Sequence, residues 1–235
     1  MKTIKPVSFL NLLLLFSSCN SQTKPIGEAT LDLSNFDFNV KITTLYPDKN
    51  KSKEYTNYYN ISTKYNTILV EKDTTFLENY SEQKKASGFT YLQKNSSNVD
   101  TLAVFEKQVF NKINIATTLK NEIMVISAVA DEMSENDNET FIKLLTDKYG
   151  KCLKTEGEFI GKFFIYEWQT NKNFIRFSTI RNNESNTLKI VIDKEKQTLN
   201  TGIKEPHYEG YFYIIKKEYL KNIKTLKTGD FVYVN

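Results

Sequence analysis

The sequence from Thr101 to Val129 reads TLAVFEKQVFNKINIATTLKNEIMVISAV, and its fold class follows from the spacing of its apolar runs. Three runs rich in Val, Ile, Thr and Phe, at 101–110, 112–119 and 122–129, are separated only by short polar breaks. Such runs with short connections are typical of neighbouring antiparallel strands. This stretch therefore predicts an antiparallel meander.

Strand signals continue on both sides of this stretch. Residues Phe36, Phe38, Val40 and Ile42 alternate with polar residues, which predicts a half-buried strand over 36–42. Further strands are expected at 66–71, 89–94, 158–169, 173–180, 187–193, 210–216 and 230–234.

Two helices are predicted between the strand groups. Asn136 is the expected cap of one, with Glu139 as its capping-box partner and Gly150 just beyond its end. The other is expected over 74–85, and a short third helix over 216–223. The sequence thus predicts an α+β fold in which antiparallel sheets (meanders) are covered by two main helices. Residues 31–235 would form one domain, or two helix-plus-meander units at about 31–121 and 122–235.

Composition and charge exclude several classes of protein. Of the 235 residues, 31 are Phe, Tyr or Trp and only 12 are Gly or Pro, which excludes a collagen-like or low-complexity chain. The 32 basic residues are 30 Lys with Arg176 and Arg181. Because bidentate recognition of bases and phosphates favours Arg, no nucleic-acid partner is expected.

The first 19 residues have the three parts of a secretory signal peptide. Lys2 and Lys5 precede a mainly apolar run over 6–16, and two serines and Cys19 follow. The apolar run is shorter than the roughly 20 residues that a membrane-spanning helix needs. We therefore expect export of the chain.

Residues Phe16-Ser17-Ser18-Cys19 resemble the lipobox of bacterial lipoproteins, with Phe16 where an aliphatic residue is usual. The resemblance implies cleavage before Cys19, a lipid on the Cys19 sulfur and attachment to a membrane of the cell envelope. Residue 20 is Asn and not the Asp that resembles a signal for retention in the inner membrane. The resemblance therefore favours the outer membrane. Residues 1–18 would then be the signal peptide and 19–30 a polar tether. The alternative is an ordinary signal peptide in which Cys19 has no special role.

Motifs for metal, cofactor or nucleophilic chemistry are absent from the sequence. With acylated Cys19, Cys152 is the remaining thiol, expected to be buried after a helix, and His207 is the single histidine. No cofactor, metal or catalytic residue is predicted. The acidic run Asp131, Glu132, Glu135, Asp137 and Glu139 could hold Ca²⁺, but these acids are better explained as stabilising a helix N-terminus.

Aromatic residues around the single Trp are the best candidates for a binding face. Tyr166 and Trp168 lie on one expected strand, and Phe174 and Arg176 on the next. Rings on a sheet face can stack on sugars or peptide side chains, although large rings more often pack in a core.

These observations favour a lipid-anchored envelope protein whose domain is a non-catalytic binding or structural module, with an envelope protein or a glycan as partner. Two alternatives stay open. One is a hydrolase that uses paired carboxylates, for which the candidates are Glu158, Glu167, Asp193, Glu195 and Glu209. The other is a lipoprotein inhibitor of a partner protein.

Overall fold

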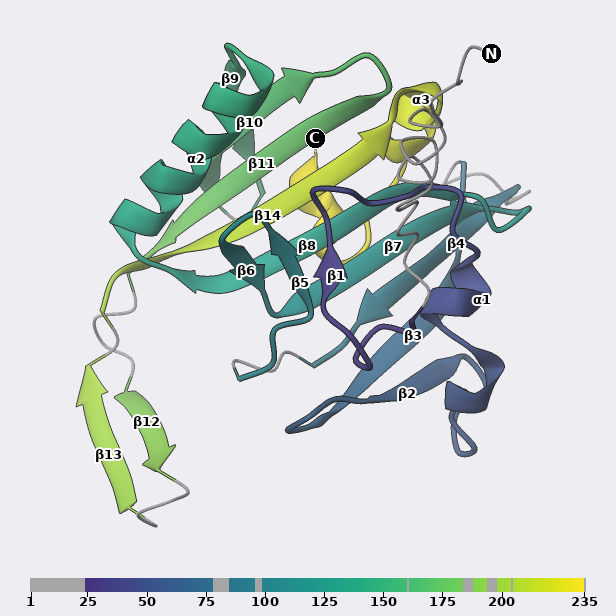
Figure 1. Cartoon of the computed structure of the whole chain (residues 1–235), viewed down its shortest axis with the longest axis horizontal. Coiled ribbons are helices and arrows are strands. Elements are labelled where there is room, and N and C mark those ends of the chain that lie inside the picture. Colours follow the sequence, from purple (N-terminus) through teal and green to yellow (C-terminus); the bar gives the residue numbers. More distant parts are fainter. Residues whose placement is uncertain are drawn as a thin grey trace, which may run out of the picture.

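The computed structural model describes residues 24–77, 85–95, 99–159, 161–183, 188–193, 198–203 and 205–234 (Figure 1). Cys19 and the expected signal peptide lie outside these residues, so the lipoprotein interpretation stays a prediction. Within the described part of the chain, no helix is both long and apolar enough to cross a membrane.

A nine-stranded antiparallel sheet forms the body of the protein (Figure 1). The strand order is β2-β3-β4-β7-β8-β14-β11-β10-β9. The strands are β2 (Tyr58–Ser62), β3 (Thr67–Phe76), β4 (Ala86–Gln93), β7 (Lys112–Thr118), β8 (Ile123–Met133), β9 (Leu153–Glu158), β10 (Lys162–Gln169), β11 (Asn173–Asn182) and β14 (His207–Lys216). The boundary considered between two units, at 121–122, falls in the turn between the paired strands β7 and β8.

Two small sheets accompany the large one. Strand β1 (Leu31–Asp32) pairs in parallel with β5 (Ala103–Phe105), which forms a hairpin with β6 (Gln108–Phe110). Strands β12 (Leu188–Asp193) and β13 (Thr198–Ile203) form a separate hairpin between β11 and β14, and it projects from the body (Figure 1).

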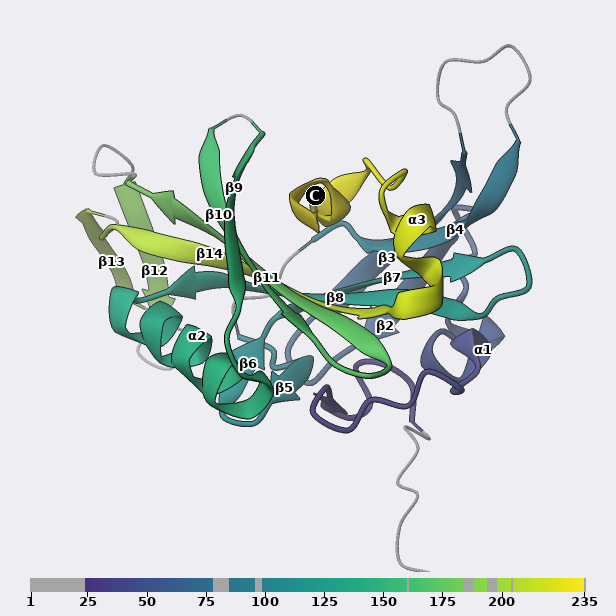
Figure 2. The ribbon, with the colours of Figure 1, turned by 90° about the horizontal axis from the view of Figure 1, so that it is seen from above.

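Both faces of the large sheet are covered (Figure 2). The small sheet β1-β5-β6 and the helices α1 (Ile42–Leu45) and α2 (Glu135–Tyr149) lie on one face, and α3 (Leu220–Ile223) and the C-terminal segment lie on the other. Strand β8 is buried at each of its first eight residues. A strand covered on both sides needs apolar residues at successive positions, which explains the nearly continuous apolar sequence of β8.

The α2 helix begins with a capping box made by Ser134 and Asp137. The Asp137 N–H donates to Ser134 Oγ (3.1 Å), and the Ser134 N–H donates to Asp137 Oδ2 (3.4 Å). The predicted cap, Asn136, instead lies inside the first turn. The predicted end is confirmed, because Gly150 follows Tyr149 with a φ of 87°, a conformation that favours Gly.

The predicted fold class is wrong. The protein is mostly β, and α2 is the one long helix in the described chain, since α1 and α3 have four residues each. The helix expected over 74–85 is replaced at its start by the end of β3, which pairs with β4, and 78–84 lie outside the described residues. The β-branched Thr74 and Thr75 extend the strand.

Two predicted strands are also wrong. In 36–42, the Asp37 carboxylate accepts from the Asn39 N–H (2.9 Å) and fixes a turn, after which Ile42 starts α1. Residues 230–234 belong to a 3₁₀ helix, η3 (Gly229–Val234). A short apolar run is compatible with either a strand or a helix. Here the chain turns at Gly229, which has a φ of 56° and is the first residue of η3.

Candidate functional site

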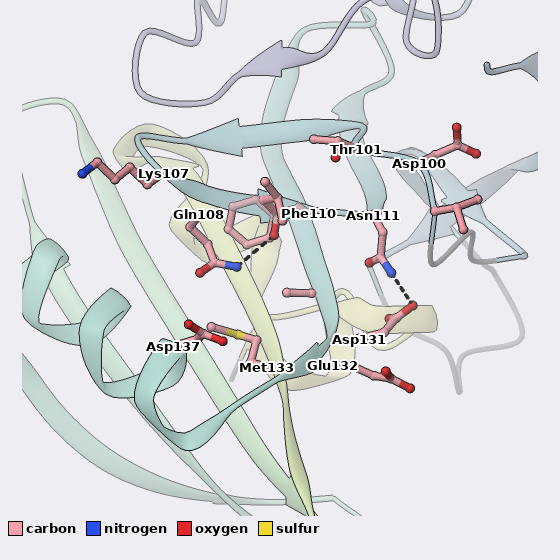
Figure 3. Close-up of a pocket in the computed structure, with 13 residues that line it drawn as sticks. Asp100, Thr101, Lys107, Gln108, Phe110, Asn111, Asp131, Glu132, Met133 and Asp137 are labelled. Atoms are coloured by element: carbon pink, nitrogen blue, oxygen red, sulfur yellow. Dashed lines mark hydrogen bonds between the residues drawn. The ribbon is translucent and has the colours of Figure 1, made fainter. Parts of the chain in front are cut away.

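A cavity of about 410 Å³ opens between the β5–β6 hairpin, β8 and the start of α2 (Figure 3). Four carboxylates, three neutral polar residues and a buried apolar floor line it. The carboxylates are Asp100, Asp131, Glu132 and Asp137, the polar residues are Thr101, Gln108 and Asn111, and the floor includes Phe110, Ala130 and Met133. Among the described residues that line the cavity, Lys107 is the one basic residue.

A β-bulge in β8 brings two neighbouring acids to this cavity. Ala130 pairs with Gly210 and Met133 with Tyr208, so two residues of β8, Asp131 and Glu132, face a single residue of β14. Consecutive side chains of a regular strand point to opposite faces of the sheet. The extra residue of a bulge changes this alternation, and here both carboxylates line the cavity (Figure 3).

The structure fixes three of the four carboxylates. Asn111 Nδ2 donates to Asp131 Oδ2 (2.9 Å), as Figure 3 shows. Asp100 accepts from Thr63 Oγ1 (2.7 Å), which belongs to the β2–β3 turn. Asp137 is the capping-box residue of α2. These bonds hold the acidic wall in place.

One buried acceptor beside the cavity is unsatisfied. Asn111 Oδ1 is buried and accepts no hydrogen bond within the described chain. A buried acceptor without a donor is costly, but this oxygen exposes almost no surface and so is not open to a ligand in the cavity. The carboxylates of the cavity wall favour a ligand group that carries several donors and a positive charge, such as a primary ammonium or a guanidinium.

A sugar fits this cavity less well. Stacking on a sugar requires an exposed ring, and Phe110, which is the aromatic residue that lines the cavity, is buried. The described residues also contain no group of three or more His, Cys, Asp or Glu side chains that could hold a metal ion. Of the acidic run in the sequence, Asp131, Glu132 and Asp137 line the cavity, and Asp137 also caps α2.

The four residues of the predicted binding face lie on both faces of the sheet. In the β10–β11 register, Trp168 pairs with Ile175 and Glu167 with Arg176, so Tyr166 and Trp168 lie on the α2 side and Phe174 and Arg176 on the other. Trp168 is only 1% exposed and is a core residue.

Arg176 has a structural role. Its Nε donates to Glu167 Oε2 (2.6 Å), and its Nη1 donates to the carbonyl oxygen of Val234 (2.6 Å). The structure does not bring these four side chains together as one surface.

The other residues singled out in the sequence also lie apart. Cys152 is a partly exposed free thiol after α2, whereas His207 is buried at the start of β14 with its Nδ1 against the carbonyl oxygen of Glu205 (3.1 Å). Glu209 accepts from Tyr211 Oη (2.6 Å) and Asn182 Nδ2 (2.6 Å). Burial, together with the hydrogen bond to Glu209, raises the pKa of Tyr211 well above its usual value.

Comparison with protein-family models, with curated proteins and with solved structures finds no match to this chain. Only the acidic run gave a sequence signal for the cavity. Asp100, Gln108 and Asn111 had no recognisable motif, because their place depends on contacts between distant strands.

Proposed function

We propose that this protein is a lipid-anchored component of the bacterial cell envelope, at the outer membrane, and that its folded domain is a non-catalytic binding module. The signal-peptide pattern that ends in Phe16-Ser17-Ser18-Cys19 carries the proposed location. The acceptor-rich cavity beside the β8 bulge carries the proposed binding role.

The ligand chemistry follows from the cavity wall. Among the described residues that line the cavity there are four carboxylates and one lysine, so a cationic donor is favoured over an anion. A basic side chain of an envelope protein has this chemistry. Hydrogen bonds to charged groups each contribute about 1.5–3 kcal/mol, enough for a weak but specific interaction.

Anchoring is tested by metabolic labelling with an alkyne fatty acid. The wild-type chain should be labelled and should sediment with membranes, while the Cys19→Ser variant should be neither labelled nor retained. A wild-type chain without label would contradict the anchor.

Binding is tested with spermidine and L-arginine methyl ester as probes, followed by NMR. The probes should shift the amide resonances of Asp131 and Glu132, and the double variant Asp131→Asn with Glu132→Gln should weaken binding about tenfold or more. The matched control is Glu135→Gln with Glu139→Gln, which removes the same charge from residues that do not line the cavity. Equal losses in the two double variants would indicate nonspecific charge attraction and refute the site.

A further inference from the structure

The first described residues of the chain are fixed to one end of the large sheet. The Ile26 N–H donates to the carbonyl oxygen of Leu45 in α1 (3.2 Å), and Lys49 Nζ lies 2.7 Å from Glu28 Oε1. A Cβ on Gly27 would lie 2.9 Å from the carbonyl oxygen of Ser62, at the end of β2. Residues 24–28 therefore lie against α1, the 3₁₀ helix η1 (Asp48–Asn50) and β2.

Covalent geometry limits how far this end can be from the proposed anchor. Five peptide units separate Cys19 from Lys24, and a fully extended chain spans at most about 3.6 Å per residue. The Cα atoms of the two residues are then no more than about 18 Å apart. If Cys19 carries the lipid, as the proposed function holds, this end of the sheet lies next to the membrane.

The surface around the attachment point has a composition suited to lipid headgroups. We call it the tether-side surface and define it by the exposed residues Lys24, Lys49, Lys51, Lys64 and Tyr65. The segments that form it, 24–29, 48–51 and 62–66, contain four lysines and two acids. Lysines near an anionic lipid surface are attracted to it.

Tyr65 gives this surface an aromatic contact. It lies in the β2–β3 turn, which is closed by the Thr63 N–H donating to the carbonyl oxygen of Asn66 (2.8 Å). Its side chain is 55% exposed, and Lys64 Nζ lies 4.8 Å from the ring centroid. Tyr and Lys together are enriched at membrane–water interfaces, where the ring and the ammonium both reach the headgroups.

The opposite end of the sheet lies far from the attachment point. Eight strand spacings of about 4.8 Å place β9 about 38 Å from β2 along the sheet. Figure 1 shows these two strands at opposite ends. The exposed charged residues of β9 are Lys154, Glu156 and Glu158, and Glu156 is paired with Lys162 (3.1 Å), so this end carries no excess of acids.

We infer that the tether-side surface lies against a bilayer that carries anionic headgroups, so that the β2 end of the sheet faces the membrane and the β9 end points away. This inference rests on the proposed anchor. In this orientation the sheet extends away from the membrane from its β2 end, and the acidic cavity lies near the middle of the sheet.

The experiment compares two probe positions on the acylated protein in vesicles. In a Cys152→Ser background, Ser62→Cys on β2 and Thr155→Cys on β9 each carry an NBD fluorophore, since both native residues are small, polar and exposed. Vesicles of phosphatidylcholine with phosphatidylglycerol contain a headgroup nitroxide as quencher. We expect loss of most NBD emission at residue 62 and none at residue 155.

The outcomes separate this inference from the proposed function. Equal emission at the two positions on acylated, vesicle-bound protein would overturn the orientation and leave the anchor intact. A chain that is not acylated would overturn both. Replacement of Lys49, Lys51 and Lys64 by Gln should reduce quenching at residue 62, and unchanged quenching would overturn the role of the lysines.

Discussion

Replacement of Asp230 by Ala tests how the C-terminal segment is held on the sheet. Asp230 lies in η3, on the face opposite α2 (Figure 2). Its Oδ2 accepts from Lys112 Nζ (2.6 Å) and from Asn114 Nδ2 (2.7 Å) of β7. The backbone carbonyl of Asp230 also accepts from Tyr213 Oη (2.5 Å), a bond that the substitution leaves in place.

The expected loss of stability follows from the burial of the partners. The side chains of Lys112 and Asp230 are 20% and 15% exposed, and Asn114 is fully buried. Loss of a hydrogen bond to a charged group costs about 1.5–3 kcal/mol, and an amide left buried without a partner costs about 1–3 kcal/mol. Because the two effects overlap at one carboxylate, we expect the free energy of unfolding to fall by about 3 kcal/mol.

The assay is urea unfolding followed by the fluorescence of Trp168, a core residue. The Asp230→Asn variant is the control, since its amide oxygen can still accept from Asn114 but cannot form the ion pair with Lys112. It should lose about half as much stability as Asp230→Ala. A loss below about 0.5 kcal/mol for Asp230→Ala, the range of ordinary surface substitutions, would refute the reasoning.

Three further predictions concern helix capping, close packing and alkaline pH. Ser134→Ala should lower the free energy of unfolding by about 1 kcal/mol in urea titrations, because the α2 N-terminus loses its cap. Gly88→Ala should destabilise strongly, since its Cβ would lie 1.9 Å from a carbonyl oxygen of β7, whereas Gly161→Ala, with no atom within 4 Å of its Cβ, should be neutral; equal melting temperatures would contradict this packing. Burial raises the pKa of Tyr46 and Tyr211 well above 10, so the folded state holds these protons more tightly than the unfolded state. The stability they contribute should be complete below pH 10 and should fall as the pH rises above 10, and a flat alkaline stability profile would argue against their burial.

Local patterns in the sequence predicted several elements correctly. The runs at 112–119 and 122–129 correspond to β7 and β8. The prediction that 101–110 is a third strand of the same meander is wrong, because this run forms the β5–β6 hairpin of a separate small sheet. Gly150 marks the end of α2 as expected. The strands β7 and β8 are set by the residue types within each run. The end of α2 is set by Gly150, whose backbone conformation favours Gly.

Contacts that the hydrophobic pattern does not encode account for what the sequence did not reveal. The alternation over 36–42 is that of a strand, yet the side chain of Asp37 bonds to Asn39 and the segment turns. The placement of Trp168 and Arg176 on opposite faces follows from strand alternation, but which face is covered depends on α2 and η3.

The cavity depends on the same kind of contact. Asp100 is held by Thr63, 37 residues earlier, and the bulge at Asp131 exists only because β8 pairs with the distant β14. No local pattern encodes either contact.

Mass spectrometry of the N-terminal peptide from membrane-purified protein tests the proposed anchor most directly. We predict a peptide that begins at Cys19 and carries the added mass of a diacylglyceryl group. A peptide that still contains Met1, or one that begins at Cys19 without lipid, would contradict the proposed location and the membrane orientation derived from it.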